Sequence, residues 1–427
     1  MLNLTPIPYI KDVGWRGESK TPKETPPREI GIAILSLIFA ISGVCLVLNF
    51  TTRPIFASEL VYVTPSQVEV LEKAKADNTK WENKIKKKYG TNRVTFVTKG
   101  VAHVKLVKYI NKKPVKINVV EVNPKLNKNL TIKPKTAGTK LNKRAKISSI
   151  ASGEKTIVAM NGGYFKPQTG TPLGALMING EYLTGPIYNR AGIGISKNDY
   201  ETKFAIGKTG INASISNKHV NLKVDNLNQP RMLSTYVLVY NSKWGSTAPL
   251  APKYGANVVV ENGTTVNVTA NPVNIPENGY VVSGPKDLVY KLLGQKDLNL
   301  EIKPNEIFED SEHIIAGGPY LIKNGELYID VNEEKLTAIA GNNPRSAIGY
   351  NDEGEFMLIT VDGREQSSVG MTLGALARLM KSLGCTNAIN LDGGGSSVMY
   401  VNGTVKNSPA QKGGIPISNA IVVVEED

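Results

Sequence analysis

The sequence predicts an α+β fold, in which a single large, strand-rich domain with a mixed twisted sheet and a few helices follows a transmembrane helix and a helical stalk. The chain has 427 residues, a length that is too great for one ordinary core but suits one large domain with accessory segments. Its hydrophobic fraction of 41% is typical of a globular protein. Its 40 Gly, 24 Pro and 17 Tyr indicate many loops and strands. From residue 93 onward, apolar residues alternate in short runs between turns, as strands do.

The N-terminal segments predict a membrane protein. Residues 1–29 are polar and proline-rich and are expected to form a disordered cytoplasmic tail. Residues 30–52 contain no charged side chain and are long enough to span ~30 Å of hydrocarbon as a helix, so we expect a single transmembrane anchor. Five basic residues precede this run and only Arg53 follows it closely, which predicts that the C-terminal domain lies outside the cytoplasm. A cleavable signal peptide is the alternative.

Residues 53–92 are expected to form a partly helical stalk, because apolar residues recur at roughly helical spacing between Pro65 and Tyr89. The pattern changes to period two at residue 93, and residues 93–427 are expected to form the large domain. An Asn-Gly pair at 262–263, between two apolar runs, predicts a hairpin turn.

One predicted helix, over residues 371–383, has clear ends, with Thr372 as N-cap and Gly384 as the stop. It lies between two apolar strands, 356–361 and 388–391. Such strand–helix–strand units are almost always right-handed and usually join neighbouring parallel strands.

Asp362 and Asp392 follow these two strands, and each precedes a glycine. Both would therefore lie at one sheet edge, with their backbones ~4.8 Å apart if the strands are neighbours and about twice as far apart if one strand intervenes. The three glycines after Asp392 allow a sharp turn with open N–H groups, which suits a ligand site. A plain Asp-Gly hairpin turn is the alternative.

Two arginines are expected beside these carboxylates. Antiparallel pairing across the loop 351–354 brings Arg345 opposite Thr360, beside Asp362, and Arg364 lies two residues past Asp362. Guanidinium groups bind phosphate at two points, and a pair of carboxylates is the usual equipment for cleaving a glycosidic bond. The cluster therefore indicates a sugar joined to a phosphate, and a structural salt bridge between Arg345 and Asp362 is the alternative.

The net charge of +14 is concentrated in residues 73–146, which hold 22 Lys and Arg against three acidic residues. One interpretation is a basic face that binds phospholipid headgroups or an acidic polymer. The other is an ordinary solvated face. Nucleic acid is not an expected partner, because no recognition motif accompanies the charge.

Neither a disulfide framework nor a metal centre is predicted. Cys45 lies in an apolar run, and Cys385 follows the end of the predicted helix. His103, His219 and His313 lack metal-ligand spacing and are expected to be structural or solvated. No cofactor is expected, and the acidic loops leave Ca²⁺ open although no EF-hand spacing supports it.

Several motifs in order resemble the phosphodiester glycosidase family, from about Val94 to the C-terminus. They are Asn161-Gly-Gly-Tyr-Phe165, Leu238-Val-Tyr240, Ile275-Pro-Glu-Asn-Gly-Tyr-Val-Val-Ser-Gly284, Gly317-Gly-Pro319, Asn343-Pro-Arg-Ser-Ala-Ile-Gly349, Val361-Asp-Gly-Arg364 and Asn390-Leu-Asp-Gly-Gly-Gly-Ser-Ser397. The resemblance implies hydrolysis of a sugar-1-phosphodiester at the anomeric carbon, which releases a free, GlcNAc-like sugar and a phosphate monoester. It also implies a place in cell-envelope or exopolysaccharide metabolism.

With this resemblance, Asp392 is assigned as nucleophile or base and Asp362 as the residue that orients it or exchanges roles with it. Arg345 would bind phosphate, and for Asn161 the alternative is a turn cap. The full set of expected substrate-binding residues is Arg345, Arg364, Asn161, Gly162, Gly163, Gly317, Gly318, Asn390, Gly393, Gly394, Gly395, Ser396 and Ser397. The expected partners are a sugar-phosphate or phosphoglycan substrate and, through residues 30–52, the membrane. The alternatives are a non-catalytic envelope module that binds anionic glycan and a metal-dependent phosphodiesterase that cuts P–O.

Overall fold

The computed structural model describes residues 45–46, 62–63, 65–199 and 201–426, and the chain divides into two compact units, 1–72 and 73–427. The predicted tail and most of the predicted membrane anchor lie outside the described residues. The two described anchor residues form a short strand, β1 (Cys45–Leu46), antiparallel to β2 (Tyr62–Val63), where a helix was predicted. Valines flank this pair in the sequence and favour extended backbone. Within the described ranges, no helix is long and apolar enough to cross a membrane.

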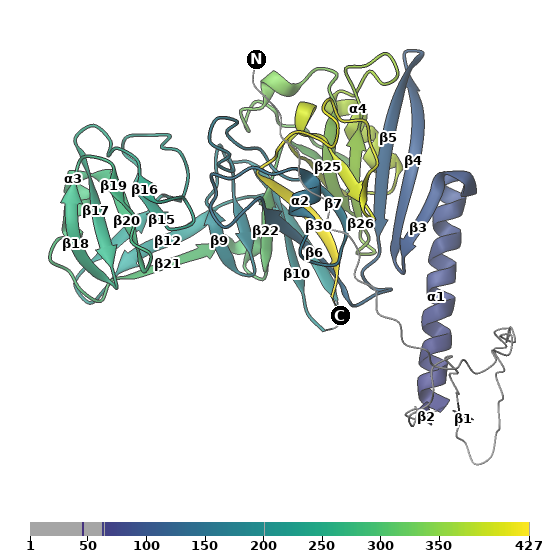
Figure 1. Cartoon of the computed structure of the whole chain (residues 1–427), viewed down its shortest axis with the longest axis horizontal. Coiled ribbons are helices and arrows are strands. Elements are labelled where there is room, and N and C mark those ends of the chain that lie inside the picture. The colour runs from purple at the N-terminus through teal and green to yellow at the C-terminus, as the bar shows by residue number, and fades with distance from the viewer. Residues whose placement is uncertain (1–44, 47–61, 64, 200, 427) are drawn as a thin grey trace, which may run out of the picture. The chain divides into compact units, whose positions relative to one another are not determined.

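A helix, α1 (Pro65–Tyr89), lies in the range predicted as a partly helical stalk (Figure 1). Proline suits its first turn, and the lysines of its last turn suit the negative end of the helix dipole. Trp81 and Ile85, four residues apart, are buried in the apolar core of the second unit. That unit begins at Lys73, and the domain predicted over residues 93–427 lies within it.

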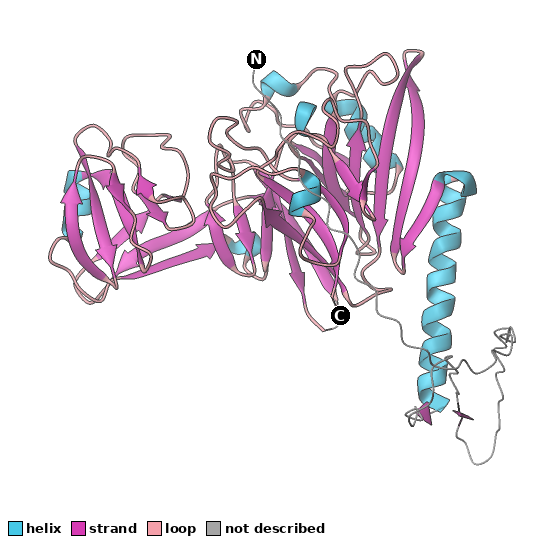
Figure 2. Cartoon of the chain, viewed as in Figure 1, coloured by secondary structure: helices cyan, strands magenta, loops and turns pink. Residues whose placement is uncertain are grey.

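Most of the second unit consists of strands and loops (Figure 2). Its largest sheet has eight strands in the order β24-β23-β27-β25-β26-β5-β4-β3. Its strands are β3 (Val94–Thr98), β4 (Val101–Ile110), β5 (Lys113–Val122), β23 (Tyr320–Lys323), β24 (Glu326–Leu327), β25 (Arg345–Tyr350), β26 (Phe356–Val361) and β27 (Asn387–Asn390). All neighbouring pairs in this largest sheet are antiparallel. Mixed pairing, as predicted, occurs in a smaller sheet, where Asn226–Leu227 pairs parallel with Leu238–Asn241. The strand-rich α+β class with few helices is confirmed.

The predicted strand–helix–strand unit is present as β26, α4 (Leu373–Ser382) and β27. Thr372 caps α4, because its side-chain oxygen accepts a hydrogen bond from Ala375 N at 3.2 Å. β26 and β27 run parallel, but β25 pairs antiparallel with both and lies between them. Asp362 and Asp392 therefore follow strands that are two inter-strand spacings apart, roughly 10 Å.

The hairpin of β25 and β26 is paired one residue away from the predicted register. Arg345 lies opposite Val361, and Ser346 lies opposite Thr360. The connecting loop covers residues 351–355, and Asn351 N donates a hydrogen bond to Glu355 O at 3.1 Å across it. It is one residue longer than the predicted loop 351–354. Because side chains alternate between the faces of a strand, this shift changes the partner that Arg345 faces.

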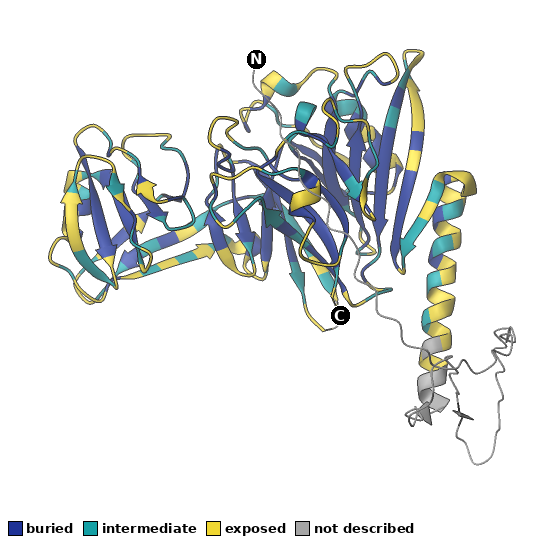
Figure 3. Ribbon diagram, viewed as in Figure 1, coloured by how far each residue is buried: buried dark blue, intermediate teal, exposed yellow. Residues whose placement is uncertain are grey.

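The two faces of the eight-stranded sheet are covered differently (Figures 1 and 3). Met357 and Ile359 of β26 share an apolar core with α1 and α4, whereas Leu358 between them belongs to a second core. Two five-stranded sheets contribute to the second core, β29-β28-β7-β30-β6 and β11-β10-β22-β8-β9. Their strands are β6 (Leu130–Thr136), β7 (Thr156–Asn161), β8 (Leu176–Ile178), β9 (Glu181–Thr184), β10 (Ala191–Lys197), β11 (Thr202–Lys208), β22 (His313–Ala316), β28 (Met399–Val401), β29 (Thr404–Val405) and β30 (Asn419–Glu425).

Residues 211–304 form the remaining sheets. One of their apolar clusters is shared with β8, β9 and β22, and a second one, around Tyr240 and Ile275, lies wholly within this range. Their strands are β12 (Ile211–Ser216), β13 (Asn221–Val224), β14 (Asn226–Leu227), β15 (Leu238–Asn241), β16 (Thr247–Ala248), β17 (Gly255–Glu261), β18 (Thr264–Thr269), β19 (Val273–Asn274), β20 (Gly279–Pro285) and β21 (Asn299–Pro304). The predicted turn between β17 and β18 is confirmed, with φ of 49° at Asn262 and 72° at Gly263. Two short α-helices, α2 (Ile147–Ile150) and α3 (Lys286–Val289), complete the described helices of this type.

Candidate active site

Six of the predicted site residues line one small pocket of about 160 Å³: Arg345, Arg364, Asn390, Asp392, Gly393 and Gly394. They meet because the start of β25 and the ends of β26 and β27 lie at the same edge of the antiparallel sheet. Tyr164 and Asn343, which were not predicted individually, complete much of the wall.

The carboxyl group of Asp392 is the main ionisable group of the pocket. Asn161 Nδ2 donates to the Asp392 main-chain oxygen at 2.7 Å, and Gly393 N donates to Asp392 Oδ1 at 2.9 Å. Burial raises the pKa of Asp392 to about 6, while hydrogen bonds from Ser396 and Gly393 and the charge of Arg190 lower it. Asp392 is therefore mostly ionised at neutral pH, yet it exchanges a proton more readily than an ordinary aspartate.

Asn390 and Tyr164 form a hydrogen-bonded part of the wall. Asn390 Nδ2 donates to Tyr164 Oη at 2.9 Å and to Gly318 O at 3.1 Å, and Tyr164 Oη donates to Gly318 O at 2.8 Å. Asn390 Oδ1 is buried and has no hydrogen-bond partner. An unpartnered buried acceptor costs about 1–3 kcal/mol, so this oxygen is a candidate acceptor for a ligand hydroxyl.

Arg345 lines the pocket, but its guanidinium serves the protein backbone. Its Nε donates to Met371 O at 2.9 Å, and its Nη2 donates to the main-chain oxygens of Ile339 and Gly341. These bonds join the loop before β25 to the start of α4. The structure thus gives Arg345 a loop-holding role, whereas the sequence predicted a phosphate ligand.

Arg364 is exposed at the pocket and donates from Nη2 to Asn343 Oδ1 at 2.8 Å. Gly394 packs against it with φ of 59°, and a Cβ there would lie 3.3 Å from Arg364 Nη2. The amides of this glycine loop are less available to an anion than predicted. Gly394 N donates to Pro344 O at 2.9 Å, Gly393 N is bound to Asp392, and the third glycine, Gly395, does not line the pocket.

Asp362 does not line the pocket, and this corrects its predicted position beside Asp392. Its Oδ1 accepts hydrogen bonds from Asn407 Nδ2 and Ser408 N, each at 3.0 Å, and its main-chain oxygen accepts one from the Ser368 hydroxyl at 2.6 Å. The intervening strand β25 and these bonds hold its carboxylate to the 407–408 loop.

Two predicted glycine pairs, 162–163 and 317–318, support the pocket without lining it. A Cβ on Gly163 would lie 2.4 Å from Ala316 O, and a Cβ on Gly317 would lie 2.4 Å from Asn390 O. These positions need glycine because two backbones approach closely there.

Asn161, Ser396 and Ser397 are also buried beside the pocket and outside its lining. Asn161 Oδ1 accepts from the Ser346 hydroxyl at 2.7 Å and from a main-chain N–H at 3.1 Å, while its Nδ2 holds Asp392. The Asn161 amide is therefore occupied by hydrogen bonds within the protein and positions the Asp392 loop. The sequence analysis had predicted a direct contact between Asn161 and the substrate.

The sequence analysis missed Arg190, which is only 6% exposed. Its guanidinium carbon lies 4.7 Å from the ring centre of Tyr164 and 5.5 Å from that of Tyr188. Both Nε and Nη1 are buried without a hydrogen-bond partner. The only sequence signal was an arginine placed directly before the apolar run of β10.

The described residues contain no group of three or more His, Cys, Asp or Glu side chains placed to hold a metal ion. His103 bonds to Asn118 Oδ1 at 3.1 Å, and His313 Nδ1 accepts from Asn179 N at 3.1 Å. Burial lowers the pKa of both histidines to about 4, so they are neutral at physiological pH.

Comparison with known proteins shows a similarity to one family over part of the chain. Residues 254–424 match the phosphodiester glycosidase family. Over 108 residues, the chain is 32% identical to the N-acetylglucosamine-1-phosphodiester alpha-N-acetylglucosaminidase of Mus musculus, a match that covers 23% of this chain and 21% of the mouse protein. The match thus spans about a fifth of that relative's length.

Two solved structures share the fold. A hypothetical protein from Synechocystis matches with a TM-score of 0.68 and 25% identity, over 77% of this chain and 62% of the other. A putative exported protein from Burkholderia pseudomallei K96243 matches with a TM-score of 0.61 and 20% identity, over 73% of this chain and 74% of the other.

Proposed function

We propose that the protein hydrolyses a sugar-1-phosphodiester at the anomeric carbon, and the match of residues 254–424 to the phosphodiester glycosidase family supports this proposal. The products are a free sugar and a phosphate monoester. One observation carries the proposal: a single pocket holds the ionisable Asp392, the unpartnered oxygen of Asn390 and the guanidinium of Arg364. Such a pocket offers a carboxylate to the anomeric carbon, an acceptor to a sugar hydroxyl and a positive charge to phosphate.

The reaction needs only one carboxylate at the anomeric carbon. Asp392 either attacks this carbon and forms a glycosyl ester that water then hydrolyses to the free sugar, or takes a proton from water that attacks the carbon directly. In both routes the bond from carbon to the phosphate oxygen breaks with its electron pair on phosphate. A phosphate monoester has a second pKa near 6, so it leaves without a strong general acid. The position of Asp362 outside the pocket is compatible with this pathway.

We propose an N-acetylglucosamine-like sugar, because the mouse relative is named for that substrate. The test is hydrolysis of an α-linked N-acetylglucosamine-1-phosphodiester in ¹⁸O-water by the purified chain. Label in the released sugar supports C–O cleavage, whereas label in the phosphate would mean P–O cleavage, as in a phosphodiesterase. Binding of anionic glycan with no turnover would instead favour a non-catalytic envelope module.

We also propose that residues 30–52 anchor the protein in the cell membrane, with the C-terminal domain outside the cytoplasm in envelope or exopolysaccharide metabolism. The uncharged run and the basic residues before it support this orientation. Protease treatment of intact and of lysed cells tests it. Cleavage of the domain only after lysis would contradict the proposed orientation.

A further inference from the structure

The segment 188–190, beside the Asp392 pocket, has an unusual backbone. Tyr188 and Asn189 both adopt positive φ, 50° and 49°. Bulky residues rarely adopt this conformation, and it persists at positions where neighbouring contacts hold it, often at ligand sites. Here Asn189 Nδ2 donates to Glu333 Oε1 at 2.9 Å, and Arg190 N donates to Ile187 O at 3.1 Å.

These contacts hold Arg190 in place without occupying its guanidinium. Within the part of the chain that the structure describes, this guanidinium has ring contacts but no hydrogen bond or ion pair. A guanidinium has five N–H donors and keeps its charge when buried. Arg190 is therefore a buried cation that lacks an anion.

The charged groups near Arg190 are Glu334, Asp392 and, when ionised, the Tyr164 and Tyr188 hydroxyls. Glu334 is already engaged, because it accepts from Lys208 Nζ at 2.8 Å and from a main-chain N–H at 3.3 Å. The other carboxylate in this set is Asp392 of the pocket, whose pKa Arg190 lowers.

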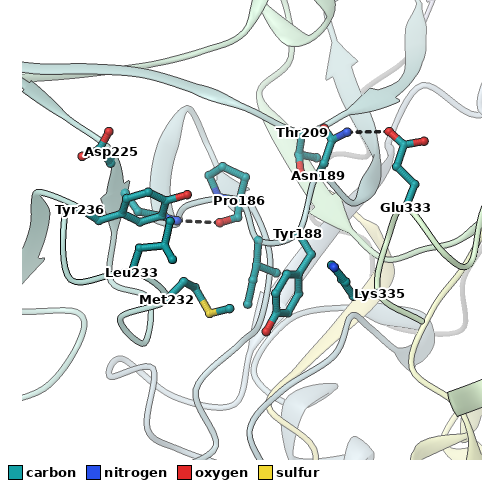
Figure 4. Close-up of a pocket in the computed structure, with 12 residues that line it drawn as sticks. Pro186, Tyr188, Asn189, Thr209, Asp225, Met232, Leu233, Tyr236, Glu333 and Lys335 are labelled. Atoms are coloured by element: carbon teal, nitrogen blue, oxygen red, sulfur yellow. Dashed lines mark hydrogen bonds between the residues drawn. The ribbon is translucent and has the colours of Figure 1, made fainter. Parts of the chain in front are cut away.

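A second hollow, which we call the Tyr188 groove, is lined by Tyr188 and Asn189 of this segment (Figure 4). It has a volume of about 550 Å³. Met232 and Leu233 line it and are 37% and 52% exposed, and Tyr236 and Tyr188 supply aromatic rings. Figure 4 shows Asn189 and Lys335 as polar groups along the same groove.

Arg190 lines neither the Asp392 pocket nor the Tyr188 groove, but its guanidinium lies at the border between them, in contact with one aromatic ring of each lining. Tyr164 lines the pocket, Tyr188 lines the groove, and the Arg190 guanidinium is within 5.5 Å of both rings. The segment 333–339 also contributes to both hollows, with Glu333 in the groove and Ile339 in the pocket.

We infer that Arg190 binds the substrate phosphate at this border, with the sugar in the Asp392 pocket and the second ester group of the phosphate in the Tyr188 groove. This inference rests on the proposed function. It specifies how the substrate is oriented between the pocket and the groove. Arg345 is less suited to the task because its guanidinium is bound to main-chain oxygens. Arg364 is exposed and is suited to a weaker, solvent-screened contact.

The first experiment measures inhibition by inorganic phosphate and steady-state kinetics of the full chain and of Arg190→Gln. We expect KM for the diester and the inhibition constant for phosphate to rise about tenfold or more, because charge-assisted hydrogen bonds are lost. Arg190→Lys should recover part of the phosphate inhibition, since it keeps the charge. Unchanged phosphate inhibition in Arg190→Gln would overturn the inference.

The matched control is Arg231→Gln. Arg231 is also partly buried, but its guanidinium donates to Tyr236 O and to Ser283. We expect this variant to lose thermal stability and to keep phosphate inhibition within about twofold, since no phosphate-binding donor is removed. Equal loss of phosphate inhibition in both variants would indicate a general packing effect and contradict a specific role for Arg190.

The second experiment tests the groove with Leu233→Asp, a change at an exposed position. Two diesters of the same sugar are compared, one with a methyl group and one with a bulky group on the far side of phosphate. KM should rise about fivefold or more for the bulky diester and stay unchanged for the methyl diester, because a carboxylate replaces apolar contact area. Equal KM changes, or none, would contradict the placement of this group in the groove.

Phosphate binding measured by calorimetry separates this inference from the proposed function. Phosphate binding that depends on Arg190, without hydrolysis of the diester, would support the anion site and contradict the proposed hydrolase function. Hydrolysis that does not depend on Arg190 would retain the hydrolase and reject the anion site.

Discussion

Asp362 and Asp392 have almost the same local sequence but different surroundings. Each follows a buried strand of the eight-stranded sheet and precedes a glycine. The Asp362 carboxylate accepts hydrogen bonds from Asn407 and Ser408, whereas Asp392 lines the pocket and keeps a pKa of about 6. The difference shows that a strand end followed by Asp-Gly can build either a loop anchor or a reactive carboxylate, and that distant segments decide which.

The largest expected effect separates these two residues by activity. Asp392→Asn should lower turnover of the sugar phosphodiester by about 10²–10⁴-fold, because it removes the nucleophile or base from the pocket. Asp362→Asn should change turnover far less. Single-turnover rates of the two folded variants check this, and equal losses would mean that the two aspartates act as a catalytic pair.

The pH dependence sharpens the same comparison. Because Asp392 acts as a carboxylate and has a pKa of about 6, kcat/KM should fall about tenfold per pH unit below that value. Removal of the positive charge in Arg190→Gln should move this acid limb to higher pH, since Arg190 lowers the pKa of Asp392. A wild-type profile that stays flat down to pH 4.5 would exclude Asp392 as the group that must be ionised.

Stability should change in opposite directions in the two Asp→Asn variants. The folded-state pKa of Asp392 is raised above its unfolded value, so the folded state binds the extra proton and loses stability as pH rises through that window. Asp392→Asn removes this cost and should raise the free energy of unfolding at pH 7 by about 1–3 kcal/mol, at about 1.4 kcal/mol per pKa unit. Urea unfolding at pH 7 measures it, and a clear loss of stability would contradict the raised pKa.

Asp362→Asn should lower the free energy of unfolding by about 1–3 kcal/mol, because the new amide NH₂ would face donors at Asn407 and Ser408. Burial also raises the pKa of Asp362, so removal of its charge offsets part of this loss at pH 7. Urea unfolding at pH 7 with Asn407→Ala as a matched variant checks this. If the two changes are made together, their effects should be less than additive. Full additivity would show that the contact contributes little.

The smallest expected effect is that of Arg364→Gln. Its guanidinium is exposed and bound to Asn343, so we expect KM to rise about two- to fivefold, with unchanged stability. The effect should shrink further at high salt, because exposed charges are screened. A loss as large as that in Arg190→Gln would move the main phosphate contact to Arg364.

The tertiary structure gives other roles to two residues that the sequence analysis had assigned to substrate binding. Arg345 and Asn161 are both at the site, but their polar groups hold loops in place. Local patterns could not show this, since the hydrogen-bond partners come from segments far away in the chain. Arg190 was missed for the same reason, because its two aromatic neighbours and its lack of an acceptor are visible only in three dimensions.

By itself, the sequence determined the strand-rich class, the capped helix α4 and the place of Asp392 after a strand, because period, caps and glycine turns are local properties. Only the tertiary structure decided that β25 lies between β26 and β27, which separates the two aspartates. It also decided which arginine keeps its hydrogen-bond donors free. Strand order and hydrogen-bond partners depend on contacts between distant segments, and one sequence does not encode those contacts in a local pattern.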